Sequence, residues 1–551
     1  MALPDTKENH RAVQKQVRLP TPLGGLNTSD PVIATGPEYA YVLSNFLTKP
    51  YGIEVRKGYK EWLPSGFAFG NQIRTLMGYS NPVAANQRLF ACESNASSTV
   101  WNITTPNTAP ISSLVPGAGA DVPGEWYYVN FNTPAENFLC AILANKGYYT
   151  YSALTGWTLV ADGTGTGKIE FKYNGVTYLS TQMTYVFSWK NRLWFLQKDS
   201  ALLWYLPTNQ ITGSAAAIDL GQLLKRGGSL YMGLDWTYDS GDGLNAYLVL
   251  CSSNGDMVIY QGSDPSTAAT FQLKGTWYIG RVPYGRRGFC AYGGDTLIAT
   301  EYGIVSVSDM VSGRLVNLQT QSSVAPKYNP SLAVIVSDNI NTPYFQLISF
   351  PTEDVVVLAS PAIDAETGIR FSCIMSHFGN SWSNMTQMDI LTAIFAQGNF
   401  IFADRGGKVF LGFTGFRDAA SYDGTTTVGS EVTGTFATSF QSYGSPNSNK
   451  RAQRIRLLGR IGGSVSFGAK LRGEYDLSSP PSVPSPASSA PSIWDVNKWN
   501  ESLWQTPRAS FSKWFGTAGF GKLLSLQVSI RGLGSILLTD YEVTYEEGIG
   551  L

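Results

Sequence analysis

The sequence predicts an all-β protein: a six- or seven-bladed β-propeller plus a smaller β-sandwich-like domain built from the C-terminal region and the N-terminal segment. Short runs rich in Val, Ile, Tyr, Phe and Trp alternate with polar residues and end at Gly, Asn or Asp. A unit of two strands recurs along the middle of the chain at a spacing of about 45 to 60 residues, which suits a four-stranded propeller blade. Helical periodicity is almost absent.

The amino-terminal residues divide into an arm and a packed segment. Residues 1–22 are polar and lack the apolar core of a secretory signal, so we expect a flexible arm. Residues 23–70 are expected to pack on the C-terminal domain. Within them, TGPEYAYVLSNF is predicted to form a short helix, with Thr35 as its cap and Pro37 in its first turn.

The repeated unit places the predicted propeller at residues 71–417. Copies begin at Gln87, Asn137, Asn191, Ala246, Asp295 and Asn399, with a looser copy near Tyr344. Six or seven blades fit this length, and the alternative is a pair of β-sandwiches whose hairpins resemble one another. A second helix is predicted in SAAAIDLGQLLKRGG, because this run ends on glycines.

The last domain is predicted at residues 418–551. Its Pro/Ser-rich stretch, 477–492, is too poor in apolar groups to pack and is expected to be a linker or an exposed loop. Trp494, Trp499 and Trp504 follow at a spacing that fits neither a helix face nor a strand face, which predicts a looped segment that inserts its rings between sheets. The final run, KLLSLQVSIRGLGSILLTDYEVTYEEG, predicts two long antiparallel strands.

The composition excludes several classes of function. Forty basic and forty acidic residues give no whole-chain field that would attract nucleic acid or an acidic membrane. Only 15% of residues are charged and 13% are aromatic, so we expect much surface to be buried in sheets or subunit contacts. The five cysteines lie far apart and predict reduced, buried thiols. No apolar run reaches the length of about 18 residues that a transmembrane helix needs.

The sequence contains few of the residue patterns that enzyme active sites use. With only His10 and His377, a histidine-dependent triad or a multi-histidine metal centre is excluded. The run DGTGTGKIEF departs from a phosphate-binding loop, because Asp162 and Ile169 stand where that loop has Gly and Ser or Thr. We therefore expect no enzyme activity, no cofactor, and no catalytic, cofactor-binding or metal-ligating residue.

The strongest local charge signal is the run NKRAQRIRLLGR. On a strand, Arg454 and Arg456 would share one face while Ile455 and Leu457 share the other, so one face would be cationic. The candidate residues for contact with DNA or a partner protein are Lys450, Arg451, Arg454, Arg456 and Arg460. The alternative is a solvated outer face of a sheet. Weaker forms of the signal are the pairs Lys225–Arg226 and Arg286–Arg287.

The run from Leu23 to Trp62 resembles the opening of tail nozzle proteins, also called tail tubular protein B, of short-tailed bacteriophages. In that family a Gly-Gly-Leu-Asn/Asp segment leads into Asp-Pro, then Leu-x-Asn-aromatic, Pro-x-Gly and Arg-x-Gly-Tyr/Phe. The matching residues are Gly24, Gly25, Leu26, Asn27, Asp30, Pro31, Leu43, Asn45, Phe46, Pro50, Gly52, Arg56, Gly58 and Tyr59. None of these positions is catalytic in character.

The resemblance implies a structural virion protein: a ring, usually a hexamer, that lies below the portal and adaptor, retains packaged DNA and conducts it during ejection. The implied partners are further copies of the chain, adaptor or head-to-tail connector proteins, tail fibres or spikes, and genomic DNA passing non-specifically through the lumen, with no membrane insertion by this chain. The implied location is the phage tail, after assembly in the host cytoplasm.

An alternative function is a carbohydrate-binding or carbohydrate-cleaving propeller, such as a phage receptor-binding protein or depolymerase. SHFGNSWS comes nearest to the repeated turn of sialidases, but it lacks the Asp of that turn and stands alone.

Overall fold

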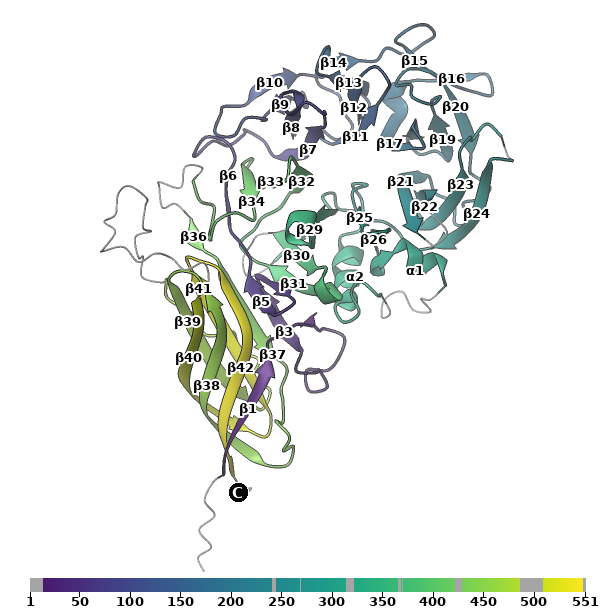
Figure 1. Ribbon diagram of the computed structural model, residues 1–551. Coiled ribbons are helices and arrows are strands. Elements are labelled where there is room, and N and C mark those ends of the chain that lie inside the picture. Colours follow the sequence, from purple (N-terminus) through teal and green to yellow (C-terminus); the bar gives the residue numbers. More distant parts are fainter. Residues whose placement is uncertain are drawn as a thin grey trace, which may run out of the picture.

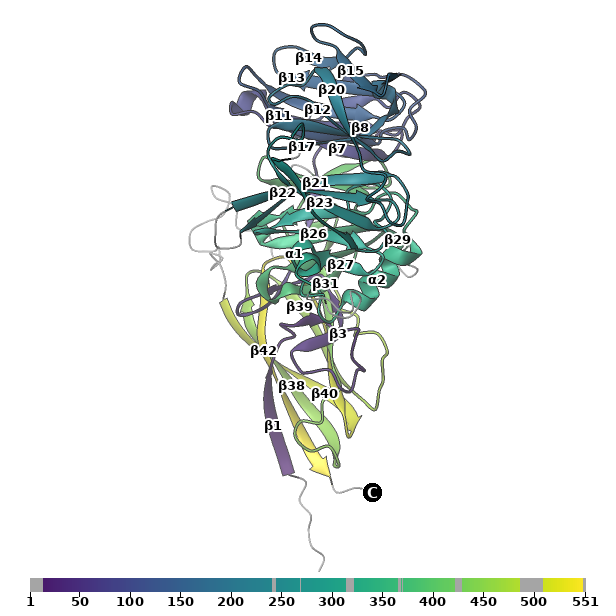
Figure 2. The ribbon, with the colours of Figure 1, turned by 90° about the vertical axis from the view of Figure 1, so that its right-hand side faces the viewer.

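The computed structural model describes residues 13–239, 244–267, 269–313, 322–364, 368, 370–421, 429–485 and 509–548. A ring-shaped body of small sheets lies against one end of an elongated β-sandwich (Figure 1). A quarter turn away, the ring is seen edge-on above the sandwich (Figure 2). The chain is therefore nearly all β, and its helices in the described ranges are too short to span a bilayer.

The first half of the ring-shaped body consists of antiparallel sheets formed by consecutive strands. The first two sheets contain β7 (Ile73–Tyr79), β8 (Arg88–Glu93), β9 (Val100–Asn102) and β10 (Ile111–Leu114), then β11 (Trp126–Asn132), β12 (Asn137–Leu143), β13 (Gly147–Ser152) and β14 (Gly156–Leu159). The third contains β15 (Ile169–Tyr173), β16 (Val176–Tyr178), β17 (Met183–Trp189), β18 (Arg192–Gln197), β19 (Leu202–Tyr205) and β20 (Gly213–Asp219). The fourth contains β21 (Leu230–Asp239), β22 (Leu244–Ser252), β23 (Asp256–Gly262) and β24 (Phe271–Tyr278).

The second half has more varied sheets. They contain β25 (Phe289–Tyr292), β26 (Asp295–Thr300) and β27 (Gly303–Ser306), then β28 (Gln346–Phe350), β29 (Val355–Ile363), β30 (Arg370–Ser376) and β31 (Ser381–Met385), then β32 (Thr392–Ala396), β33 (Asn399–Ala403) and β34 (Val409–Gly412). Two α-helices, α1 (Val307–Val311) and α2 (Asn329–Asp338), lie between β27 and β28. The short 3-10 helices are η1 (Ala84–Asn86), η2 (Ser180–Gln182), η3 (Pro351–Glu353) and η4 (Phe378–Asn380).

Contacts between neighbouring sheets close the ring. β7 contacts β11, β11 contacts β17, and β17 contacts β21, which in turn contacts β26. Next, β25 contacts β28, β28 contacts β32, and β32 contacts β7 again. The N-terminal strand β6 (Tyr59–Glu61) pairs antiparallel with β34 and so adds an outer strand to the last sheet. The body is propeller-like, and residues from both ends of its sequence meet in one sheet.

The tightest hairpins follow from their turn residues. Both residues of Asn174–Gly175 and of Lys190–Asn191 have positive φ, and each pair connects two antiparallel strands. Two-residue turns with this geometry match the right-handed twist of the flanking strands and favour Asn and Gly. The sequence therefore sets these hairpins locally.

Aromatic side chains fill the spaces between adjacent sheets. Trp126, Trp194 and Trp204 are completely buried. Tyr148 of the second sheet packs edge-to-face on Phe195 of the third, with the ring centroids 5.3 Å apart. The five cysteines are free and buried, as their spacing predicts. The high aromatic content is thus used largely within the chain.

The β-sandwich combines both ends of the sequence. One sheet contains β4 (Phe46–Lys49), β5 (Gly52–Val55), β42 (Ile536–Gly548), β38 (Asn449–Ile461) and β40 (Ala509–Gly521), with β1 (Val13–Pro20) also paired to β42. The facing sheet contains β2 (Gly25–Leu26), β3 (Tyr39–Ser44), β37 (Thr433–Thr438), β41 (Leu524–Gly532) and β39 (Val465–Gly473), and β3 also pairs with β31 of the ring. A two-stranded sheet of β35 (Arg417–Asp418) and β36 (Ser430–Glu431) lies nearby in sequence.

Both predicted helices are wrong. TGPEYAYVLSNF contains the strand β3, which pairs with β37 through a register shift between Ala40 and Val42. That shift brings Ala40 and Leu43 to buried positions, which imitates the spacing of a helix face. SAAAIDLGQLLKRGG contains the strand β20, which pairs with both β19 and β15. Tertiary pairing has overridden the helix propensity of its alanines.

The C-terminal run does form two long strands, but they do not pair with each other as predicted. β41 lies in one sheet of the sandwich and β42 in the other, because the chain crosses between the sheets at residues 533–535. Residues 477–485 of the Pro/Ser stretch have no regular structure, yet Gln527 Nε2 donates to the Ser478 carbonyl at 2.8 Å. The rest of that stretch, with Trp494, Trp499 and Trp504, lies outside the described residues.

Candidate functional site

The predicted basic strand is β38, which lies between β42 and β40. Ile455 and Leu457 are buried in the sandwich core, while Arg454 is exposed and Arg456 is half-buried on the outer face. Arg451 and Arg460 are also exposed. Strand alternation brings Arg454, Arg456 and Arg460 to the outer face, and a register shift between Ala452 and Arg454 brings Arg451 there as well.

The outer face is not uniformly cationic, contrary to the sequence interpretation. Arg456 lies opposite Glu542 of β42 and forms an ion pair with it at 3.2 Å. Its Nε donates to Ser512 Oγ at 2.6 Å, and its guanidinium lies 5.3 Å from the Trp514 ring centroid. Cross-strand pairing thus places a column of acids beside the arginines. Within the described ranges, Arg451, Arg454 and Arg460 form no ion pair.

Lys450 does not belong to this face. Its side chain is buried, and Nζ donates to the carbonyls of Ser445 at 2.5 Å, Ser448 at 3.1 Å and Lys522 at 2.7 Å. Burial lowers the pKa of Lys450. A register shift between Ala452 and Arg454 brings Lys450 and Ala452 to buried positions and Arg454 to an exposed one. Lys450 is therefore a structural residue and offers nothing to DNA or a partner.

The residues of the family resemblance gather where the ring joins the sandwich. Arg56 and Asp418 form a fully buried bidentate ion pair with both N···O distances at 2.8 Å. Asn45, which has φ of 61°, accepts a hydrogen bond from Arg56 Nε at 2.9 Å and donates to the Thr433 carbonyl at 2.8 Å. Arg56 also donates to the Thr386 carbonyl at 2.8 Å. We call this group the junction; burial raises the pKa of Asp418 despite the opposing effect of Arg56.

Other residues of the resemblance support the same region sterically. A Cβ on Gly58 would lie 1.9 Å from the Arg417 carbonyl oxygen, and one on Gly25 would lie 2.8 Å from the Trp382 nitrogen. Asp30 forms an ion pair with Lys327 at 2.8 Å. Gly24 leaves room for the Tyr39 ring, and the Pro31 carbonyl accepts a hydrogen bond from Thr35. Leu43 packs in the core, and the Tyr59 hydroxyl donates to the Gln387 carbonyl.

A third arginine site lies near the ring axis and was only weakly signalled by the sequence. Residues 281–288, here called the axial loop, carry Arg286 and Arg287 inward. Arg287 donates to the carbonyls of Arg74 at 3.0 Å and Trp126 at 2.8 Å, and to Thr75 Oγ1 at 2.6 Å. Its own carbonyl accepts from the Leu347 nitrogen at 3.0 Å. One residue thus ties three sheets together.

Arg286 extends the same linkage to further sheets. It donates to the Thr184 carbonyl at 3.1 Å, and its guanidinium lies 4.7 Å from the Tyr231 ring centroid and 5.3 Å from that of Tyr127. The hydroxyl oxygen of Tyr127, which donates to the Glu125 carboxylate, also lies 3.1 Å from the Gly285 carbonyl oxygen. Burial raises the pKa of Tyr231 to about 12. The axial loop therefore cross-links the ring through its centre, and the adjacent arginines Arg286–Arg287 were the only signal of it in the sequence.

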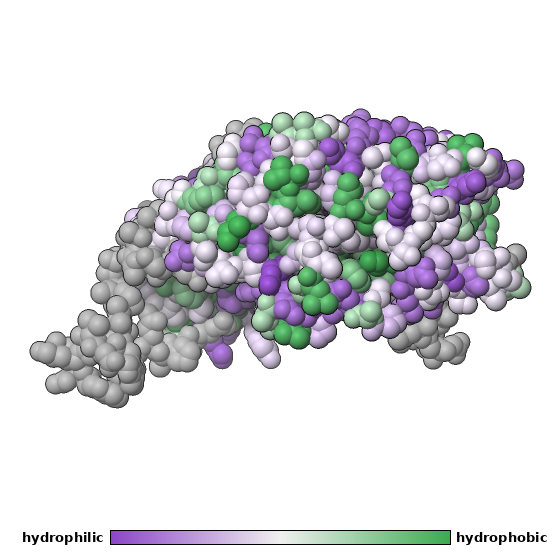
Figure 3. Space-filling view, turned by 90° about the horizontal axis from the view of Figure 1, so that it is seen from above, coloured by the Kyte–Doolittle hydropathy of each residue, from purple (hydrophilic) through white to green (hydrophobic). Residues whose placement is uncertain are grey.

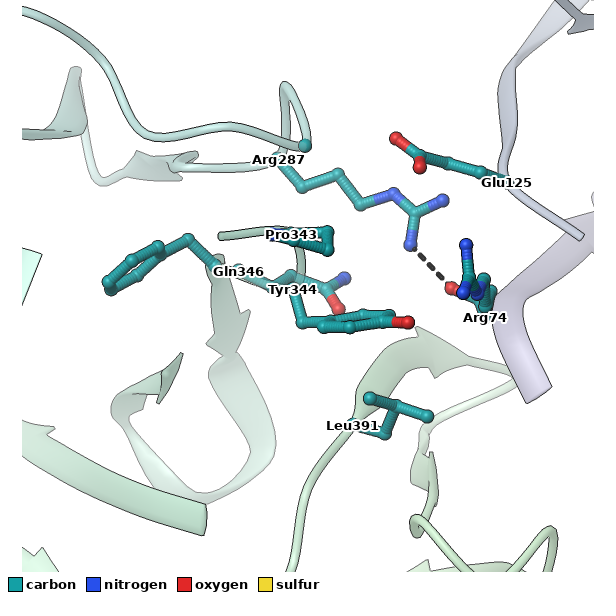
Figure 4. Close-up of a pocket in the computed structure, with 9 residues that line it drawn as sticks. Arg74, Glu125, Arg287, Pro343, Tyr344, Gln346 and Leu391 are labelled. Carbon is teal, nitrogen blue, oxygen red and sulfur yellow. Dashed lines mark hydrogen bonds between the residues drawn. The ribbon is translucent and has the colours of Figure 1, made fainter. Parts of the chain in front are cut away.

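A pocket beside the axial loop contains both charge signs (Figure 4). Arg74, Glu125, Arg287, Tyr344 and Gln346 lie in its wall, with Arg74 and Glu125 on the side opposite Pro343. Tyr344 has φ of 90°, a strained value for a residue with a large side chain. A neighbouring cavity of about 190 Å³ shares Arg287 and Gln346 with this pocket.

The surface shows no obvious apolar docking area on the face seen in Figure 3, where hydrophobic residues are scattered among polar ones. Large exposed apolar side chains are spread over several elements, among them Ile111 on β10 and both Trp514 and Phe520 on β40. In the part of the chain that the structure describes, no group of three or more His, Cys, Asp or Glu residues is arranged to hold a metal ion.

No family model matches the chain, and no curated protein matches it. Three solved structures show a distant likeness to the chain. The extracellular domain of a hybrid two component system from B. thetaiotaomicron matches 90% of this chain and 63% of its own, with 9% identity and a TM-score of 0.42. The designed protein Ika8 matches 64% of this chain and 100% of its own, with 11% identity and a TM-score of 0.36. YCF48 bound to a D1 peptide matches 63% of this chain and 94% of its own, with 10% identity and a TM-score of 0.33.

Proposed function

We propose that the protein is a structural component of a short-tailed phage tail, a nozzle that assembles into a ring, retains packaged DNA and conducts it during ejection. The observation that carries the proposal is the run from Leu23 to Trp62, whose resemblance to tail nozzle proteins includes Asn45, Arg56 and Gly58. These residues lie at the junction, where their hydrogen bonds and close packing connect the sandwich to the ring. A part that must hold two bodies rigidly under pressure needs such a connection.

We also propose that the ring-shaped body is a seven-bladed β-propeller. The blades would begin at β7, β11, β17, β21, β25, β28 and β32. The last blade would take its outer strand from β6, so that the two ends of the repeat close the circle. Such closure leaves few free strand edges and suits a stiff virion part.

The outer face of β38 is the proposed contact with the next protein ring or with DNA. Arg451, Arg454 and Arg460 are exposed there, and Trp514 adds an aromatic surface that is 46% exposed. The acids of β42 beside them favour a protein partner, because a phosphate backbone would be repelled by Glu546 and Asp540.

Mass photometry and negative-stain imaging of the purified protein, alone and mixed with the connector proteins of its phage, test the proposal. A ring of identical subunits, or addition to a connector ring, is expected. A protein that stays monomeric in both settings would overturn it. Release of sugars from host polysaccharide by that monomer would instead favour the carbohydrate-cleaving alternative.

The arginine face is tested with Arg454→Ser and Arg456→Ser together in an intact phage. Particles that lack the tail tip, or that lose DNA after packaging, are expected if the face contacts the next ring. Weakened DNA binding with a shallower salt dependence is expected if it contacts DNA. Normal titre and normal genome retention would mean that the face is only solvated.

A further inference from the structure

The arginine face is the outer surface of β1, β42, β38 and β40, and each strand gives it a column of different chemistry. β40 contributes the exposed rings of Trp514 and Phe520, and β38 contributes mostly arginines. β42 contributes mostly acids, and β1 contributes glutamines and one arginine. Cross-strand partners share a face. One row across the strands contains Gln14, Glu546, Arg451 and Phe520, and another contains Arg18, Glu542, Arg456 and Trp514.

The β38 and β42 columns also differ in exposure. Arg451 and Arg454 on β38 are exposed and form no ion pair within the described ranges. Glu542 on β42 is only 8% exposed, and both Gln16 and Arg456 donate to its carboxylate. Long and exposed arginine side chains therefore lie beside a column of shorter, more buried side chains.

These columns complement themselves under one symmetry operation. A twofold axis parallel to the strands, lying in the contact plane between β38 and β42, would place the β38 column of one copy over the β42 column of the other. The same rotation would place β40 over β1. A twofold axis perpendicular to the strands would instead place arginines over arginines, which repel each other. Charge complementarity therefore selects one orientation for a second copy of the chain.

The strand register shows which charged groups would meet. Arg451 would lie over the second copy's Glu546, because these two residues occupy the same row. Arg454 is paired in register with Thr544, so it would reach the second copy's β42 column between two acids. By symmetry every contact occurs twice. Two arginines that have no ion pair within the described part of one chain would thus each gain an acidic partner.

The flanking strands and the ring-shaped body are compatible with this arrangement. Trp514, which is 46% exposed, would lie over the second copy's Arg18, whose side chain is 61% exposed. An arginine over an indole ring is a favourable cation–π contact. The ring-shaped body lies mainly to one side of the sandwich (Figure 1). The rotation would therefore carry most of the second ring to the opposite side.

We propose that the arginine face pairs with the same face of a second copy in the free protein. Four strands about 4.8 Å apart and about eight residues at about 3.3 Å each give about 500 Å² per copy, or about 1,000 Å² in total. Stable interfaces bury about 1,200 Å² or more, so the pair should be weak and reversible.

The pair goes beyond the nozzle proposal, because an isologous contact closes on itself and does not by itself generate a cyclic ring. Its proposed role does rest on the nozzle proposal: the second copy would cover the arginine face until a connector ring displaces it.

Sedimentation velocity of the full chain over about 5–200 μM tests the pairing. The unmodified chain should shift from monomer to dimer across this range, and high salt should weaken the dimer because exposed charges are screened. Arg451→Glu and Glu546→Arg should each lose at least about tenfold in affinity, since symmetry makes each substitution act twice. The control Lys172→Glu makes the same charge change on β15 of the ring and should pair like the unmodified chain.

An equal mixture of the Arg451→Glu and Glu546→Arg variants gives the sharpest test. In a mixed pair each reversed charge faces an opposite charge on the other copy, so dimers should return although each variant alone fails to pair. If either variant does not fold, judged by near-ultraviolet circular dichroism, Arg454→Glu decides, because Arg454 is exposed and should also lose at least about tenfold.

Three results would overturn the proposal: no dimer of the unmodified chain at the highest concentration, a mixture of folded variants that does not pair, or equal pairing by the unmodified chain and the variants on β38. None of them touches the nozzle proposal, which is tested by addition to a connector ring.

Discussion

The axial loop and the outer face of β38 carry the same sequence signal, a short cluster of arginines in a chain of zero net charge, but the fold uses them in opposite ways. Arg286 and Arg287 are adjacent in a loop, and Arg286 has φ of 52°. Their side chains therefore diverge and contact different sheets. Arg454 and Arg456 are two residues apart on a strand and share one face. Local charge alone does not say whether an arginine crosses the interior or lies on the surface.

Arg56 extends the comparison to an arginine that is buried and also forms an ion pair. Arg56→Ala removes the partner of Asp418 and leaves an uncompensated buried carboxylate, so the free energy of unfolding should fall by about 3–5 kcal/mol. Denaturant unfolding measures this loss. Lys57→Ala is the matched control, since the side chain of Lys57 is 49% exposed and its ion pair with Glu353 should contribute little. Equal effects at both positions would contradict the role assigned to the junction.

The axial loop should show the next largest effect. Arg287→Ala deletes charge-assisted hydrogen bonds to Thr75 Oγ1 and to the carbonyls of Arg74 and Trp126, which should cost at least about 3 kcal/mol of unfolding free energy. Arg281→Ala in the same loop is the control, because Arg281 is 47% exposed and, among the described residues, forms an ion pair with Glu301 alone. A loss at Arg287 no larger than that at Arg281 would remove the claim that the loop cross-links the ring.

On β38 the effects should be small. Arg456→Ser loses a partly exposed ion pair and a ring contact, so up to about 1 kcal/mol of unfolding free energy is expected. Arg454→Ser should change it by no more than about 0.5 kcal/mol in either direction. Thermal and denaturant unfolding of both variants check these values. A loss at Arg454 as large as that at Arg287 would abolish the distinction between the two regions.

The smallest effect should be local and dependent on pH. The Lys15 ammonium, together with Ser448, lowers the pKa of Glu547 from its ordinary value of 4.5 to about 2. Because the pKa is lower in the folded state, the stabilising contribution is complete above pH 4.5 and is lost as the pH falls toward 2. The protection factors of the β1 amides against hydrogen exchange should therefore fall over that range, because β1 pairs with β42 beside this contact. Lys15→Ala should remove this pH dependence, and protection factors that stay unchanged between pH 5 and 3 would contradict the assignment.

The sequence by itself determined the features that depend on neighbouring residues. Alternation predicted the burial of Ile455 and Leu457, and the turn residues Asn174–Gly175 lie in a tight hairpin between β15 and β16. The repeated two-strand unit predicted many small antiparallel sheets, which the structure has. Strand periodicity and turn conformation arise from backbone sterics within a few residues, so they can be read without knowing the fold.

Only the tertiary structure decided which distant segments meet. Arg56 pairs with Asp418, β6 joins β34, and β3 becomes a strand because β31 and β37 lie on either side of it. The register shift in β38 buries Lys450, and ring closure brings Arg287 to Thr75 and Arg74. These contacts join residues far apart in the chain, and their energies exist only once the sheets have closed on one another, so no local pattern in the sequence could reveal them.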